Sequence, residues 1–210
     1  MKKLMVITCV AALFAWGCDD NYFTDGGVLD ERPGVLGVST MDYLESRREL
    51  FDTLATLIRL CGLEEAVNRP GSTFLAPQDY AIHNFFELAF PNPDERPATL
   101  AELPEELLAE IAEIIKNYII PNEAIVRTGL STAYSHTETL GGKKARFNLV
   151  RGDYLGNVNM GASVIVFSLD VSGGIGRERY QSVHVVTSDL QSTNGIIQIL
   201  RSDTHIFGFN

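Results

Sequence analysis

The sequence predicts an α+β fold, and three observations lead to this prediction. Apolar residues recur at three- and four-residue steps through much of residues 39–120, as in amphipathic helices. One short apolar strand, Ser72–Ala76, interrupts them. After Pro121 the chain changes to strand-like runs separated by Gly and Asn turns. Helices with one early strand, followed by mostly antiparallel strands, predict one α+β domain over residues 38–210.

The beginning of the chain predicts its destination. Lys2 and Lys3 precede the apolar run Leu4–Trp16, which is shorter than the about 20 residues that a bilayer span needs. A small residue, Gly17, follows this run. Residues 1–17 therefore predict a secretory signal peptide.

The end of this segment, Ala15-Trp16-Gly17-Cys18, resembles a bacterial lipobox, although Leu is the commoner residue at the first of these positions. The resemblance implies that Cys18 is lipidated and becomes the mature N-terminus. We then expect a lipid-anchored protein of the cell envelope, in the outer membrane, with its domain in the periplasm or exposed at the cell surface. The alternative is an ordinary signal peptide with a chance cysteine. Asp19-Asp20 leaves the sorting open, because such acidic residues mark inner-membrane retention in some lipoproteins and surface export in others.

Composition restricts the partners. Residues 18–37 are rich in Asp and Gly, which predicts a flexible acidic tether. The formal net charge is −10 and becomes −12 without Lys2 and Lys3. A chain this acidic repels phosphate backbones and anionic lipid, so we expect no nucleic-acid partner. Membrane attachment then depends on the lipid at Cys18.

Capping residues and helix breakers give the order of the helical part. Ser39 with Asp42 resembles a helix cap, and Gly62 ends the apolar pattern of residues 51–61. Pro77 ends the early strand and Asp79 is expected to cap the next helix.

The remaining elements follow from periodicity. That next helix is predicted over Tyr80–Phe90, and three prolines then form a turn. The strongest helical pattern covers Leu103–Ile120, with one apolar side: Leu107, Leu108, Ile111, Ile114, Ile115 and Tyr118. Gly141-Gly142 suits a hairpin turn, and strands are predicted at 144–150, 163–168, 181–187 and 195–200.

Three motifs resemble the fasciclin (FAS1) domain family. Ser72–Ala81 is similar to its first signature, Thr139–Lys143 to its Thr-Leu-x-Gly hairpin, and Ser188–Ile197 to its second signature, where Asn-Gly opens the last strand. Their order agrees with one FAS1 domain over about residues 38–207. The resemblance implies a sandwich-like antiparallel β core with a helical layer. It also implies a binding and adhesion module of cell surfaces, not an enzyme.

The chain departs from the family pattern at buried polar positions. The family often has histidine where this chain has Tyr118, before the apolar pair and proline Ile119-Ile120-Pro121. Its second signature usually continues to His and Asp, where this chain has Gln198 and Arg201. We therefore expect these polar contacts to be made differently, and integrin-type activity of the Tyr-His region is not carried over.

Motifs for catalysis, metal binding or cofactors are absent from the sequence. The histidines are scattered, without metal-ligand spacing, HExxH or a Gly-x-Ser-x-Gly elbow: His83, His136, His184 and His205. His184, in an apolar strand, is expected to have a hydrogen-bonded structural role. Cys61 could be a nucleophile, but its place at the end of an apolar helical pattern favours a buried thiol. We expect no enzyme, metal or cofactor.

Three further patterns have ordinary structural explanations. Gly173–Gly176 favours a hairpin over a phosphate loop, because no helix follows. Glu105, Glu106, Glu110 and Glu113 form an acidic helical face that suits solvent better than a cation site. Arg151-Gly152-Asp153 is the integrin-binding tripeptide of host matrix proteins, and chance occurrence is the alternative to an adhesive loop.

These observations predict a FAS1 lipoprotein that binds rather than catalyses. The leading hypothesis is adhesion to, or capture of, a protein or glycan ligand. The second is an accessory subunit of an outer-membrane transport or polysaccharide-uptake complex, which a large exposed apolar patch would favour. The third, an enzyme, would need a concave pocket with converging titratable groups.

Overall fold

The computed structural model describes residues 34–152, 161–174 and 176–209. They belong to one compact unit, Pro33–Asn210, with its own hydrophobic core. The helices are α3 (Thr40–Ser46), α4 (Arg48–Leu60), α5 (Glu64–Val67), α6 (Asp79–Ala89) and α7 (Glu105–Lys116), with the short 3-10 helices η1 (Pro93–Glu95), η2 (Leu100–Glu102) and η3 (Arg127–Gly129). The strands are β1 (Ser72–Ala76), β2 (Ile119–Ile120), β3 (Ser135–Glu138), β4 (Lys144–Arg151), β5 (Ser163–Asp170), β6 (Tyr180–Gln191) and β7 (Gly195–Leu200).

The strands form a seven-stranded sheet in the order β2-β1-β7-β6-β5-β4-β3. All neighbours are antiparallel except β1 and β7, which run parallel. The Leu140 amide beyond β3 donates to the Ile119 carbonyl of β2 at 2.8 Å, so the two edges come together and the sheet nearly closes into a barrel. Tyr118 beside β2 lies 6.5 Å, between ring centroids, from Phe167 of β5 across the enclosed core. The predicted α+β fold with an antiparallel β core is confirmed.

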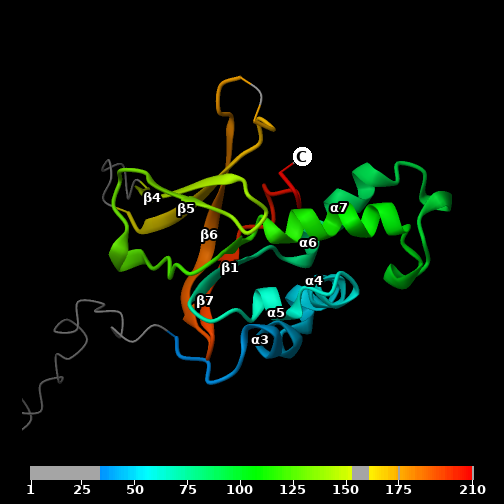
Figure 1. Ribbon diagram of the computed structural model, residues 1–210, viewed down its shortest axis with the longest axis horizontal. Coiled ribbons are helices and arrows are strands. Elements are labelled where there is room, and N and C mark those ends of the chain that lie inside the picture. Colours follow the sequence, from blue (N-terminus) through cyan, green and yellow to red (C-terminus); the bar gives the residue numbers. More distant parts are fainter. Residues whose placement is uncertain (1–33, 153–160, 175, 210) are drawn as a thin grey trace, which may run out of the picture. The chain divides into compact units, whose positions relative to one another are not determined.

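The helices gather against one end of this sheet. Figure 1 shows α4, α6 and α7 together on one side of the strands, while β4 and β5 lie on the opposite side. The apolar face of α4, with Leu54, Leu57 and Ile58 at 0% exposure, supplies the centre of this layer. Burial of each such side chain stabilises the fold by about 1.5–3 kcal/mol. Among the helices of the described residues, none is long and apolar enough to cross a membrane.

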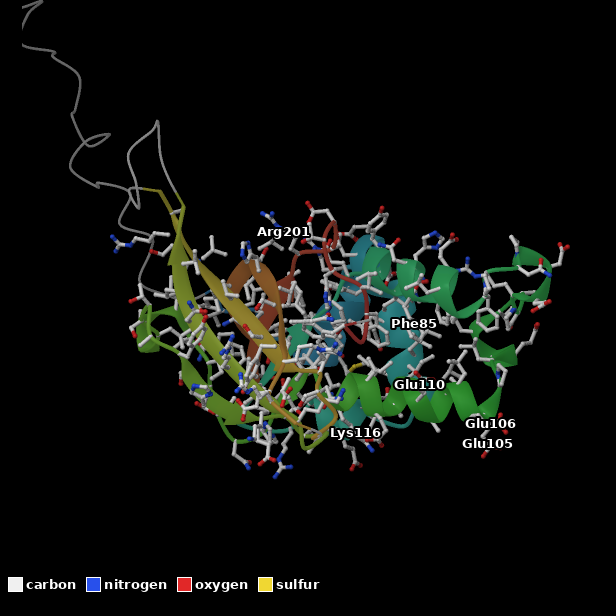
Figure 2. All side chains as sticks on the ribbon, turned by 90° about the horizontal axis from the view of Figure 1, so that it is seen from above. Phe85, Glu105, Glu106, Glu110, Lys116 and Arg201 are labelled. Atoms are coloured by element: carbon white, nitrogen blue, oxygen red, sulfur yellow. The ribbon has the colours of Figure 1, made fainter. Side chains whose placement is uncertain are left out.

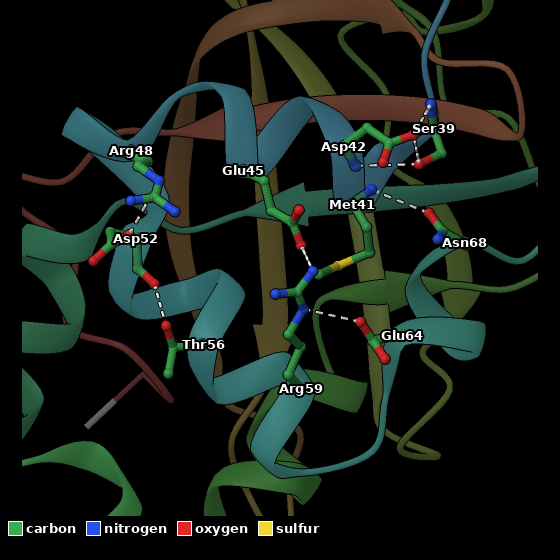
Figure 3. Close-up of polar contacts among 10 residues, drawn as sticks. All are labelled: Ser39, Met41, Asp42, Glu45, Arg48, Asp52, Thr56, Arg59, Glu64 and Asn68. Carbon is green, nitrogen blue, oxygen red and sulfur yellow. Dashed lines mark hydrogen bonds and ion pairs between the residues drawn. The ribbon is translucent and has the colours of Figure 1, made fainter.

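Polar contacts fix the turn from α3 into α4 (Figure 3). The Asp42 amide donates to Ser39 Oγ at 3.1 Å and the Ser39 amide donates back to Asp42 Oδ2 at 3.3 Å, which confirms the predicted cap. Arg59 of α4 bridges Glu45 of α3 and Glu64 of α5. These ion pairs are partly exposed, so each contributes at most about 1 kcal/mol and serves mainly to fix geometry.

Asp79 caps a different helix from the one predicted. The α6 cap position is Gln78, without a side-chain bond. The Asp79 carboxylate instead accepts the Thr53 and Leu54 amides of α4, at 2.9 and 3.0 Å. The reason is a kink at Phe51 (φ −138°, ψ 16°), which begins a new helical turn whose first amides lack intrahelical partners. The strand–Ala-Pro–x-Asp motif therefore joins β1 to α4.

The predicted helix Leu103–Ile120 is too long at both ends. The helix α7 ends at Lys116, and Ile119–Ile120 forms β2. Asn117 stops the helix because its amide group donates to the Glu113 carbonyl and accepts the Thr139 hydroxyl, both at 2.9 Å. Tyr118 is buried as predicted, but it lies beside the sheet and not on the apolar side of a helix.

The predicted strands are confirmed: β1 and β7 have the predicted bounds, and β4, β5 and β6 are longer than predicted. The strands β2 and β3 were missed. Gly142 (φ 77°) makes the predicted hairpin turn between β3 and β4. Within the segment predicted as a tether, Val35 pairs with Gln191 at the end of β6, so residues 34–36 lie along the domain.

Candidate functional site

The residues predicted to carry function lie in different places. Cys18 is outside the described residues, as is Asp153. Arg151 is the last residue of β4, where it pairs with Ser163 and its Nε donates to Ser163 Oγ at 3.1 Å. Gly152 is exposed and begins the β4–β5 connection. Arg151 therefore belongs to a strand, not to the loop that the adhesive interpretation expected.

The histidines and the cysteine do not form a reactive centre. His83, His136 and His184 are exposed, so the predicted structural role of His184 is wrong: its neighbours Val183 and Val185 point into the core instead. Cys61 is half-buried, and its Sγ lies 3.5 Å from the Leu108 carbonyl. Burial raises the pKa of the Cys61 thiol, which suits the predicted structural role.

The other two predicted patterns have the expected structural character. Gly173, Gly174 and Gly176 have positive φ in the connection between β5 and β6, which are antiparallel, as expected for a hairpin. The four glutamates Glu105, Glu106, Glu110 and Glu113 are exposed along α7. Within the described ranges, no three His, Cys, Asp or Glu side chains are placed to hold a metal ion.

Charge is divided unevenly between the two parts of the domain. Residues 34–126, which hold α3–α7, contain 16 acidic and 6 basic residues, a formal charge of −10. Residues 127–201, which hold β3–β7, contain 5 acidic and 8 basic residues, a formal charge of +3. The strongly negative total therefore belongs to the helical part, and the sheet part attracts anions.

Three side chains form a stack on the outer face of the sheet, which we call the tyrosine–arginine stack: Tyr134, Arg146 and Tyr180. The guanidinium carbon of Arg146, on β4, lies 3.9 Å from the ring centroid of Tyr134 and 3.9 Å from that of Tyr180. Such cation–π contacts hold the planar guanidinium in one orientation. Both faces of the guanidinium are covered, and its Nε is buried without a hydrogen-bond partner, so a ligand could reach only the terminal NH groups of its edge. Arg146 has no carboxylate within ion-pair distance in the described part of the chain.

Polar side chains continue the stack across neighbouring strands. In register with Arg146 are His136 on β3 and Ser168 on β5. Ser168 Oγ lies 2.8 Å from Ser182 Oγ of β6. The sheet pairing thus lines up an imidazole, a guanidinium and two hydroxyls in one row, with the exposed outer ring of Tyr134 beside them.

A carboxylate borders the stack on its other side. Glu178 accepts the Lys144 ammonium at 2.5 Å and the Tyr180 hydroxyl at 3.1 Å. The hydrogen bond and charge of Glu178 raise the pKa of Lys144, and Lys144 lowers the pKa of Glu178 in return. Partial burial, together with Glu178, raises the pKa of Tyr180, so its hydroxyl stays protonated at neutral pH. Lys144 is thereby neutralised locally, whereas Arg146 has no carboxylate partner among the described residues.

A second surface lies between α6 and α7, and we call it the α6–α7 groove. Its cavity volume is about 500 Å³, and six of its lining residues are apolar: Phe85, Leu88, Ala89, Phe90, Pro104 and Leu107. Figure 2 shows Phe85 near Glu110, which also lines the groove, with Glu105 and Glu106 at the beginning of α7. Leu88 is 59% exposed, so its side chain is accessible at the edge of this apolar lining.

The motif residues hold the fold together rather than forming a surface. Asn194 Oδ1 accepts the Thr40 amide and the Ser192 hydroxyl, at 3.0 and 2.8 Å, and so joins the beginning of β7 to α3. Residues 49–202 match the family model of the Fasciclin domain. The chain belongs to the fasciclin family. FAS1 domains are in general binding and adhesion modules without catalytic activity. No curated protein matches the chain.

The departures from the FAS1 pattern are compensated inside the core. Tyr118 is 1% exposed; its hydroxyl accepts the Gly208 amide at 2.9 Å and lies 2.8 Å from His205 Nε2. Buried Gln198 donates to the Ile125 carbonyl at 2.7 Å and pairs with Asp189. These are the contacts that satisfy the polar groups of Tyr118 and Gln198 in this chain.

The tyrosine–arginine stack of this FAS1 domain was missed in the sequence. Part of it was predictable, since Lys144, Arg146 and Asn148 alternate with Ala145 and other apolar residues, which places Arg146 on the outer face. The partners were not predictable, because the tyrosines come from segments that meet Arg146 only after the strands pair.

Proposed function

We propose that this protein is a lipid-anchored lipoprotein of the cell envelope, in the outer membrane, whose FAS1 domain is an adhesion module for protein or glycan ligands. The observation that carries the binding part of this proposal is the tyrosine–arginine stack. Tyr and Arg are, with Trp, the residue types enriched among the side chains that dominate binding surfaces, because each combines apolar area with hydrogen bonding. The fixed guanidinium edge of Arg146 suits a carboxylate, sulfate or amide oxygen of a ligand.

Ligand binding can be tested with the Pro33–Asn210 unit, which has its own core and is therefore expected to fold alone. We would measure its binding to immobilised matrix proteins and to neutral and acidic polysaccharides. Tyr134→Ala should weaken binding to the best ligand by about tenfold. The control is Tyr80→Ala, which removes a similarly exposed tyrosine from α6, 56% exposed against 51% for Tyr134. Equal effects of both variants, or no binding to any ligand, would contradict an adhesive role of the stack.

The anchor requires a separate test in cells. Cys18→Ala should prevent lipidation and release or mislocalise the protein. In a separate assay, protease is added to intact cells that carry the wild-type protein. The protease should remove the domain if it is exposed at the cell surface. Protection until the outer membrane is broken would exclude surface adhesion and point to periplasmic ligands.

The α6–α7 groove supports a second candidate function. An accessory subunit of an outer-membrane transport or polysaccharide-uptake complex would need an apolar docking surface, and this groove has an apolar lining with an exposed leucine, Leu88. Co-purification of such a complex with the wild type, but not with Leu88→Ser, would favour this role over free adhesion.

A further inference from the structure

We propose that the α6–α7 groove binds a partner segment that carries both apolar and basic side chains, in the manner of an amphipathic helix lying in a groove. This inference goes beyond the adhesive function, because the groove and the tyrosine–arginine stack are formed by different elements. The occupant follows from two independent properties of the groove, its apolar lining and its charge.

The lining determines one face of the occupant. Phe85 at 4% exposure forms part of the floor, and Leu88 and Leu107 lie above it from the two helices. A volume of about 500 Å³ is in the range of ligand sites and holds several apolar side chains. The α7 helix is about 18 Å long at about 1.5 Å per residue, which suits about three turns of a partner helix lying alongside it.

The rim determines the charge of the occupant. Glu110 lines the groove, and Glu106 and Glu113 lie four residues before it and three residues after it, so they share its side of α7 (Figure 2 labels Glu106 and Glu110). Glu113 is paired with Lys116 at 2.6 Å. Glu106 and Glu110 have no cation within ion-pair distance among the residues that the structure describes. Lysine or arginine side chains beside the apolar face would complement these two carboxylates.

The neighbouring cation does not reverse this preference. Arg96, at the adjoining hollow beyond Phe90, stacks over Phe86 and lies 3.5 Å from Glu87. Its charge is therefore compensated within the domain. The groove then presents a net negative rim around an apolar floor.

The test uses the Pro33–Asn210 unit and three synthetic 18-residue peptides with helical patterns, composed of Leu and Lys, of Leu and Glu, and of Gln and Lys. Fluorescence anisotropy should show the Leu/Lys peptide binding at least about tenfold tighter than either of the others. Leu88→Ser should weaken this binding by about tenfold, which corresponds to about 1.4 kcal/mol. The double change of Glu106 and Glu110 to Gln should weaken it and reduce its dependence on salt concentration.

Matched control variants lie on the sheet. Val186→Ser removes an exposed apolar side chain of β6, and Glu138→Gln removes an exposed carboxylate of β3. Neither should change peptide binding. Equal binding of the Leu/Glu and Leu/Lys peptides would overturn the charge assignment, and equal loss in Val186→Ser and Leu88→Ser would overturn the location. Dimerisation of the wild-type unit that Leu88→Ser abolishes would show that a second copy fills the groove instead. None of these results depends on ligand binding at the stack, so the two proposals fail separately.

Discussion

Acidification tests the buried pair formed by His205 and Tyr118. His205 is 4% exposed, and its burial lowers its pKa from 6.5 to about 4. Burial also raises the pKa of Tyr118, so the hydroxyl stays protonated and can donate to His205 Nε2 while it accepts the Gly208 amide. Protonation of His205 would convert Nε2 from an acceptor into a donor and would place an uncompensated charge in the core.

The size of the effect follows from proton linkage. The folded-state pKa of His205 lies below the unfolded value, so the neutral form is favoured in the fold. This contribution to the free energy of unfolding is fully present above about pH 6.5 and is lost as the pH falls toward 4. Between pH 7 and pH 4.5, the loss from this single histidine is about 2.5 kcal/mol.

The assay is urea unfolding at pH 7, 5.5 and 4.5 for the wild type and for His205→Gln, followed by circular dichroism. Glutamine keeps donor and acceptor atoms for Tyr118 but does not titrate. The carboxylates titrate in both proteins, so the difference between the two pH profiles isolates the histidine. The wild type should lose about 2.5 kcal/mol more than His205→Gln on acidification.

A control variant removes a histidine that stays in water in both states. His184 is exposed on β6, so His184→Gln should follow the wild-type profile. Parallel profiles for the wild type and His205→Gln would refute the reasoning, since they would mean that His205 binds its proton equally well in the folded and unfolded chain.

Two further substitutions test the motif residues by thermal unfolding. Gly195→Ala should destabilise the domain by about 1–3 kcal/mol, because the added Cβ would overlap the Ser72 carbonyl in the parallel β1–β7 pair. The control is Gly129→Ala, which should be nearly neutral because a Cβ on Gly129 would meet nothing closer than 3.9 Å. Asp79→Ala should lower the free energy of unfolding by about 1–2 kcal/mol, because two α4 amides lose their acceptor. The control is Asp203→Ala, which removes an exposed ion pair of 3.7 Å and should change stability little. Equal effects of the two variants would contradict the capping role of Asp79.

Local patterns predicted the elements whose cause is local. The apolar stripe and Gly62 were enough to predict α4, and the alternation of apolar and polar residues was enough to predict β4. Both patterns arise because each element packs one face against the core. The end of α7 is different. Asn117 and Tyr118 continue the helical spacing, and the helix stops because Thr139 and the sheet compete for them. A contact between residues that are far apart in the sequence cannot be predicted from the periodicity of apolar residues.

The candidate sites divide in the same way. His184 stands between Val183 and Val185, so alternation alone already placed it outward, and the apolar composition of its strand was the misleading part. The partner of Asp79 could not be predicted, because the kink at Phe51 that frees the α4 amides leaves no mark in the sequence. The tyrosine–arginine stack likewise needs the pairing of separate strands before it exists.

The division of charge links the two proposed surfaces. A net charge of −10 predicts attraction to cations for the whole chain, but the field near a surface depends on the charges within about one Debye length, about 8 Å at physiological salt. The α6–α7 groove lies among the surplus carboxylates of residues 34–126, and the stack lies within the basic residues 127–201. The two proposed surfaces therefore suit ligands of opposite charge, which would not compete for one site. Added salt should weaken both interactions, whereas Arg146→Gln should weaken an anionic ligand at the stack and leave a cationic peptide in the groove unaffected.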